Sequence, residues 1–157
     1  MSIASQIIEA SKATGISPML LAAVIHQESA GNPYAIRYEP AFFKKYVEDR
    51  TRKTMLGYVP TRCSFETEAR LRAHSFGLMQ VMGQVLRERG FKAEFLTEAL
   101  DPKTNLKWGS EFLQTLLLKH ENTETALLRW NGGGNKNYAK EVLGHVDSGD
   151  CHYLLSS

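Results

Sequence analysis

The feature that most constrains the fold is the helical spacing of apolar residues, which recurs along nearly the whole chain. Two of these segments open with a strong helix-start signal, a capping side chain followed by proline, at Ser17-Pro18 and at Asp101-Pro102. The chain has no convincing alternation of apolar and polar residues of the kind that strands show. The pattern therefore predicts a mainly α-helical (all-α) chain that forms one domain over residues 1–157.

The stretch between residues 32 and 63 is the least regular part of the pattern. Within it, Gly57 and Pro60 of MLGYVPTR indicate a turn or a small hairpin in the region 50–63. Helical spacing resumes at Ser64, and we predict a further helix over about residues 76–89, ending at Gly90.

Composition limits the partners that the chain can have. The 157 residues are 43% hydrophobic and 23% charged, which is typical of a globular protein with a real core. The formal net charge of +2 is too small to indicate a nucleic-acid partner. The longest early apolar run, Met19–Ile25, is too short to span a bilayer, so we expect no membrane insertion. We expect the chain to act as a monomer.

The two cysteines, Cys63 and Cys151, match no metal-ligand spacing, and the chain has no CxxC and no paired His/Cys motif. No metal site is therefore predicted. Two free thiols are favoured over a disulfide, which the sequence leaves open. The first residues lack the pattern of a signal peptide, so we expect another factor to deliver the chain to any target outside the cytoplasm.

Glu28 is the first candidate for chemistry. It lies near the end of a predicted helix and shares a face with Leu21 and Val24, at spacing i, i+3, i+7. Because that face is apolar, Glu28 should project from its edge into a pocket or groove. Desolvation there would raise the pKa of the carboxyl and keep its proton available near neutrality, as a general acid requires. On this local evidence a solvated glutamate in the last helical turn remains the alternative.

Four short segments, the first of which contains Glu28, bear on its role. They are HQESAGNPYAI at 26–36, SFGLMQVM at 75–82, DPKTNLKWGSEFL at 101–113 and ALLRWNGGGNKNYAKEVL at 126–143. In this order they resemble the motifs of the soluble lytic transglycosylases and their goose-type lysozyme relatives. The segments are spread over most of the range 20–143. The resemblance implies a lysozyme-like fold with a groove for the glycan strands of bacterial peptidoglycan, and it implies no cofactor.

The resemblance also implies roles for single residues. Glu28 matches the family's catalytic acid, and Ser29 matches the serine that helps to order the same corner. The segment that begins at Ser75 matches a motif that lines the sugar groove. Within it Met79 and Gln80 are the expected substrate contacts, whereas Leu78 is expected in the core.

The last motif departs from the family pattern. Trp130 stands where the family usually has tyrosine, so it supplies no phenolic hydroxyl, although its ring can stack on a sugar face. Asn131 follows as the family has it, in a loop that is richer in glycine than usual. Tyr138 matches a later tyrosine whose hydroxyl is expected near the catalytic carboxyl.

The resemblance implies cleavage of the β-1,4 bond from N-acetylmuramic acid (MurNAc) to N-acetylglucosamine (GlcNAc), with a 1,6-anhydro product and a single glutamate as acid and base. Two alternatives remain. The first is a hydrolytic muramidase with a second carboxylate. Glu39 is the best candidate for that role, and Arg37 beside it would favour its ionised form. The second is an inactive wall-binding or virion structural protein.

A long insert at about residues 36–74 separates the first two motifs. It resembles insertions in phage-type family members and is expected to form an extra lobe over the groove. Together with the absence of a signal-peptide pattern, it suggests a phage lysin that acts on the cell wall. A bacterial enzyme without its leader is the other interpretation.

Overall fold

The computed structural model describes residues 1–156, which are mainly helical and include one three-stranded antiparallel sheet. This agrees with the mainly α-helical fold that the apolar spacing predicts. The chain forms two units. We call the first the helical unit (Met1–Gly31 and the chain from Leu106 onward) and the second the sheet unit (Asn32–Asn105).

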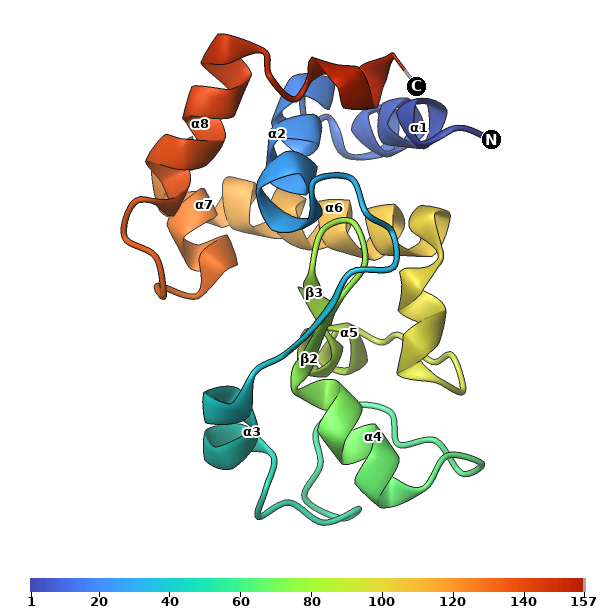
Figure 1. Ribbon diagram of the computed structural model, residues 1–157. Helices are drawn as coiled ribbons and strands as arrows, with labels where there is room; N and C mark the ends of the chain where they lie inside the picture. The colour runs from blue at the N-terminus through green and yellow to red at the C-terminus, as the bar shows by residue number, and fades with distance from the viewer. Residues whose placement is uncertain (157) are drawn as a thin grey trace. The chain divides into compact units, whose positions relative to one another are not determined.

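The helical unit is built around α2. Its elements are α1 (Ile3–Thr14), α2 (Pro18–Ser29), most of α6 (Pro102–Lys119), α7 (Thr123–Asn131), α8 (Tyr138–Ser148) and the 3-10 helix η2 (His152–Leu155). In Figure 1, α2 lies between α1 and α8, and it packs against both. Five consecutive residues, Leu21 to Ile25, are buried, so α2 is covered on all sides as the central helix of the unit.

The end of α2 has a backbone that few residues tolerate. Ala30 caps the helix in the left-handed region at φ 51°, and Gly31 follows at φ 80°. A Cβ atom on Gly31 would lie 2.7 Å from Leu154 Cδ2, so glycine lets η2 approach this end closely. The last turn of α2, which carries Glu28, is thus held by the C-terminal residues.

The sheet unit combines short strands with short helices: β1 (Ile36–Tyr38), α3 (Pro40–Tyr46), α4 (Phe65–Arg72), β2 (His74–Phe76), β3 (Val81–Met82), α5 (Gly83–Glu88) and the 3-10 helix η1 (Leu96–Leu100). The strand order is β1-β2-β3, and both pairings are antiparallel. In the register Ile36 faces Phe76 across β1 and β2, and Phe76 faces Val81 across β2 and β3.

The helix predicted over residues 76–89 is wrong in its first half. The chain there forms the hairpin of β2 and β3, and the helix begins only at Gly83. Two residues of the hairpin loop, Gly77 at φ 69° and Gln80 at φ 49°, adopt left-handed backbone conformations that a helix excludes. Asn105 holds this loop through hydrogen bonds to the backbone of Phe76 and Met79. Because Asn105 lies far from the loop in the sequence, a local pattern could not predict this constraint.

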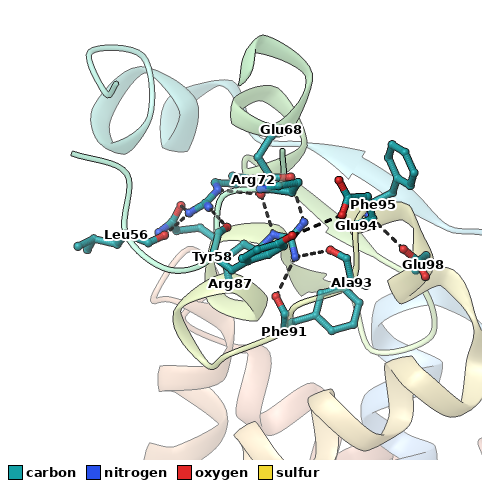
Figure 2. Close-up of polar contacts among 12 residues, drawn as sticks. Leu56, Tyr58, Glu68, Arg72, Arg87, Phe91, Ala93, Glu94, Phe95 and Glu98 are labelled. Carbon is teal, nitrogen blue, oxygen red and sulfur yellow. Dashed lines mark hydrogen bonds and ion pairs between the residues drawn. The ribbon is translucent and has the colours of Figure 1, made fainter. Parts of the chain in front are cut away.

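The small hairpin predicted in the region 50–63 is also wrong: the described residues of that region form turns and bends, and the sheet lies elsewhere. The physical reason is that the Arg72 side chain takes the place of a partner strand. The guanidinium of Arg72 donates hydrogen bonds to the carbonyl oxygens of Leu56 and Tyr58, so these acceptors need no partner strand. Figure 2 shows both carbonyls facing Arg72.

A buried ionic cluster organises this region (Figure 2). Glu68 Oε1 lies 3.1 Å from Arg72 Nε and 2.7 Å from Arg87 Nε, and all three side chains have 0% exposure. Burial lowers the pKa of Arg72 below its ordinary value. The remaining N–H groups of Arg87 reach the carbonyl oxygens of Phe91 and Ala93. One carboxylate and several backbone carbonyls thus satisfy two buried cations.

Residues 36–74 also have an apolar core of their own. Its buried members are Val47, Met55, Ala69 and Ala73, and four partly buried residues pack against them: Phe42, Phe43, Val59 and Phe65. This part of the chain is therefore an ordered structure with α3 and α4 packed over a common centre. Cys63 in this region and Cys151 in the helical unit are both buried free thiols.

Candidate active site

Glu28 occupies the last turn of α2, where its side chain is half-buried. Its Oε1 atom accepts two hydrogen bonds. The Tyr138 hydroxyl donates over 2.6 Å and the Trp130 indole N–H over 3.1 Å. Three helices therefore meet at this carboxyl, since Trp130 lies on α7 and Tyr138 begins α8.

Packing fixes both donors. Tyr138 has only 3% exposure, and α8 packs against both α2 and α7. The Trp130 ring lies 5.3 Å from the Phe112 ring, centroid to centroid. Burial, followed by the neighbouring Glu28 carboxyl, raises the pKa of the Tyr138 phenol above its ordinary value, so the phenol remains a donor. The replacement of the family's tyrosine by Trp130 thus leaves an N–H donor to this carboxyl, a contact that the sequence did not predict.

Two further predicted residues shape the backbone around Glu28. Ser29 donates its hydroxyl to the carbonyl oxygen of Ile25, one turn earlier in α2. Asn131 ends α7, and its Oδ1 accepts the backbone N–H of Asn135 over 2.7 Å, which closes the glycine-rich loop. Asn135 in turn donates to Glu141 on α8. Both polar side chains therefore hold local structure in the helical unit.

The other predicted residues belong to the sheet unit. Gln80 donates its amide N–H groups to the carbonyl oxygens of Ala35 and Gly77, at 3.0 and 2.9 Å. Met79 has 0% exposure and Ser75 has 3%, and the Ser75 hydroxyl points at Met82 Sδ. Their burial favours packing roles for Ser75 and Met79, whereas Gln80 keeps a partly exposed side chain.

Asn105 organises the loop between β2 and β3, and it is not among the predicted site residues. Its Oδ1 accepts the N–H of Met79 over 2.8 Å, and its Nδ2 donates to the carbonyl oxygens of Phe76 and Ala99. A Cβ on Gly77 would lie 2.6 Å from this amide. The sequence feature that could have indicated this role is the position of the asparagine in DPKTNLKWGSEFL, where a polar residue stands at a helical position next to apolar ones.

Glu39, the candidate second carboxylate, forms an ion pair with Arg37 over 2.6 Å. Its side chain is 32% exposed and that of Arg37 is 67% exposed. The backbone N–H of Glu39 donates to the carbonyl of Ala73, and the residue caps α3. The site residues thus fall into two sets: Glu28, Ser29, Trp130, Asn131 and Tyr138 in the helical unit, and Glu39, Ser75, Met79 and Gln80 in the sheet unit.

Helices around a half-buried glutamate, together with a small antiparallel sheet, define a lysozyme-like fold. The chain belongs to the Transglycosylase SLT domain family, whose model matches residues 5–143. This family comprises lytic transglycosylases, which act on peptidoglycan. No curated protein and no solved structure matches the chain. Among the described residues, no helix is both long and apolar enough to cross a membrane.

Proposed function

We propose that this chain is a peptidoglycan lytic transglycosylase that cleaves the β-1,4 bond from MurNAc to GlcNAc, with Glu28 as both general acid and general base. The observation that carries the proposal is the pair of hydrogen bonds on Glu28 Oε1 from Tyr138 and Trp130. They hold one oxygen of a half-buried carboxyl at the end of the central helix, and we assign the acidic proton to this carboxyl.

In the first step, the Glu28 carboxyl gives its proton to the glycosidic oxygen as the bond from that oxygen to the anomeric carbon breaks. Negative charge then develops on the carboxylate, where Tyr138 Oη and Trp130 Nε1 stabilise it. In the second step, the carboxylate accepts the proton of the MurNAc C6 hydroxyl. The O6 atom bonds to the anomeric carbon and closes the 1,6-anhydro ring, so that no water is consumed.

The remaining site residues have supporting roles in this proposal. Ser29 and Asn131 keep the backbone on either side of the catalytic carboxyl in place through their local hydrogen bonds. Gln80 contacts the glycan, while Ser75 and Met79 hold the loop that presents Gln80. This assignment changes Met79 from the predicted substrate contact to a packing role, because its side chain is buried.

We further propose that the whole chain acts as one catalytic domain, is a phage-type family member and reaches the cell wall as a monomeric lysin. The support for the phage-type assignment is the insert at about residues 36–74. The insert has an apolar core around Val47 and Met55, and it carries Glu68 of the buried ionic cluster. These features support the view that the insert is an ordered addition to the motifs of the family.

The test is mass spectrometry of purified peptidoglycan after digestion with the wild type and with Glu28→Gln. We expect anhydro-muropeptides from the wild type and none from the variant, because glutamine keeps the shape but has no acidic proton. The anhydro end and the reducing end differ in mass by one water, so the two chemistries separate cleanly.

Other outcomes would redirect the assignment. Reducing-end products that disappear in Glu28→Gln would make the enzyme a hydrolase, and Glu39→Gln would be the next variant to examine. Equal release by both proteins would contradict the role of Glu28. Binding to insoluble peptidoglycan without any release would favour a wall-binding or virion structural protein.

A further inference from the structure

A cluster of metal-binding side chains lies in the helical unit, apart from the bonds that hold Glu28. It combines His26 from α2, His145 from α8 and Asp150 from the turn after α8. One ring nitrogen of each histidine and one Asp150 oxygen all lie within 4.8 Å of one another. The sequence spacing does not predict this cluster, because more than a hundred residues separate His26 from His145 and Asp150.

We propose that His26, His145 and Asp150 bind a divalent transition-metal ion, with Zn²⁺ as the best fit. Imidazole nitrogen and carboxylate oxygen are both zinc ligands, and three protein ligands leave one position for water. Zinc–ligand bonds of about 2.1 Å place the ligand atoms of a tetrahedral site about 3.4 Å apart. The donors therefore need only small side-chain adjustments to close on an ion.

Hydrogen bonds already orient His145 for this role. Its Nε2 lies 2.8 Å from Gln27 Oε1, and Gln27 Nε2 donates to Glu141 Oε2 over 2.9 Å. The second bond fixes which end of the amide faces His145, so Nε2 must carry a proton. The other nitrogen, Nδ1, lies 2.9 Å from Asp150 Oδ2. A metal-bound histidine typically donates its second N–H to such an outer acceptor.

His26 is oriented in the same way. Its Nδ1 lies 3.2 Å from the Tyr153 hydroxyl, which itself donates to the carbonyl oxygen of Ala30 over 3.1 Å. The hydroxyl proton is therefore used, and Nδ1 of His26 must donate to the hydroxyl oxygen. This tautomer leaves the Nε2 lone pair of His26 for an ion.

The cluster is also accessible. The Asp150 side chain is 49% exposed and that of His145 is 21% exposed. An open pocket of about 490 Å³ is lined by His145, Asp150, Gln27 and Glu141 among others, so an ion has a path from solvent. Bound there, the ion would tie α2 to α8 and to the turn that follows it. The inference concerns structure and ion binding, and it does not depend on the proposed catalytic activity.

The test is isothermal titration of the full-length, EDTA-treated protein with zinc sulfate near neutral pH. We expect one ion per chain. His26→Ala and His145→Ala should each weaken binding by about 100-fold or more, and Gln27→Ala by about 10-fold, because outer-shell partners contribute about 10- to 100-fold. His120→Ala is the matched control, since His120 directly follows α6 and is not part of the cluster. Circular dichroism of each variant without metal checks that it is folded.

A second measurement needs no variant. Co²⁺ added to the wild type should give the intense visible absorption of a tetrahedral complex and should be displaced by Zn²⁺. Absence of binding, an octahedral cobalt spectrum, or equal zinc affinity in the wild type and both histidine variants would each overturn the proposal. In the last case the zinc would be bound adventitiously elsewhere.

Discussion

At the scale of single residues, the two donors on Glu28 Oε1 are unequal, and the difference can be measured. The Tyr138 bond is 2.6 Å long and the Trp130 bond is 3.1 Å long. If both stabilise the carboxylate that forms on proton transfer, Tyr138→Phe should lower kcat about 100-fold and Trp130→Phe about 10-fold, with smaller changes in KM. Initial rates of muropeptide release give both constants.

The matched control for this prediction is Trp108→Phe, because Trp108 is the other tryptophan of the chain and lies on α6 near Lys107. Its kcat should equal that of the wild type. The double variant Tyr138→Phe/Trp130→Phe should lose less than the product of the two single losses, because both donors act on one oxygen. Unchanged kcat in Tyr138→Phe would contradict the electrostatic role.

Asp101 supplies a pH-dependent contribution to stability. Its Oδ2 accepts the backbone N–H of Thr104 over 2.8 Å and the Thr104 hydroxyl over 2.7 Å, so it caps the start of α6. These bonds lower the pKa of Asp101 below its ordinary value. The contribution is therefore fully present above the unfolded pKa of about 3.9 and is lost as the pH falls through the lower folded pKa.

Asp101→Ala should accordingly reduce the free energy of unfolding by about 1 kcal/mol near neutrality and by much less at a pH of about 2. Urea denaturation at the two pH values measures this. Asp101→Asn is the control, because it caps without a charge and its difference from Asp101→Ala should not vary with pH. A loss in Asp101→Ala that is the same at both pH values would rule out the ionised cap.

At the scale of elements, α4 offers two glutamates in opposite environments. Glu68 is fully buried between Arg72 and Arg87, whereas Glu66 pairs with Arg70 at the surface and is 78% exposed. Glu68→Gln would leave two buried guanidinium groups without their carboxylate. We expect a loss of about 3–5 kcal/mol in the free energy of unfolding, whereas Glu66→Gln should cost less than about 0.5 kcal/mol.

Hydrogen exchange gives the Glu68 prediction spatial detail. Arg72 holds the carbonyls of Leu56 and Tyr58, and Arg87 holds those of Phe91 and Ala93. Loosening of the cluster should therefore speed amide exchange first in residues 50–63 and 91–93. Similar losses of stability in Glu66→Gln and Glu68→Gln would show that the cluster contributes no more than a surface pair.

At the scale of the whole molecule, local sequence patterns predicted the features that depend on residues close in the sequence, such as helices. The cap-then-proline patterns at Ser17-Pro18 and Asp101-Pro102, together with the apolar spacing, predicted the helical class, although the Ser17 side chain makes no capping hydrogen bond. They failed where a distant group decides the backbone: Arg72 replaces a partner strand in the region 50–63, and Asn105 holds the hairpin where a helix was expected. The motif around Glu28 predicted this residue as the catalytic carboxyl. The Trp130 N–H donor and the cluster of His26, His145 and Asp150 could not be predicted, because only tertiary packing brings these residues together.

The charge balance of the chain limits how strongly salt should affect its activity. With 19 basic and 17 acidic side chains, the protein carries a formal net charge of +2, so long-range attraction to an anionic wall should contribute little. Recognition by hydrogen bonds and packing at short range is not screened by salt. Raising ionic strength from about 0.05 to 0.3 M should therefore change kcat/KM less than about threefold. The rate of muropeptide release at low substrate measures it, with a highly basic lysozyme as the salt-sensitive reference. A fall of tenfold or more would mean that a local basic surface, and not short-range contacts alone, draws the protein to the wall.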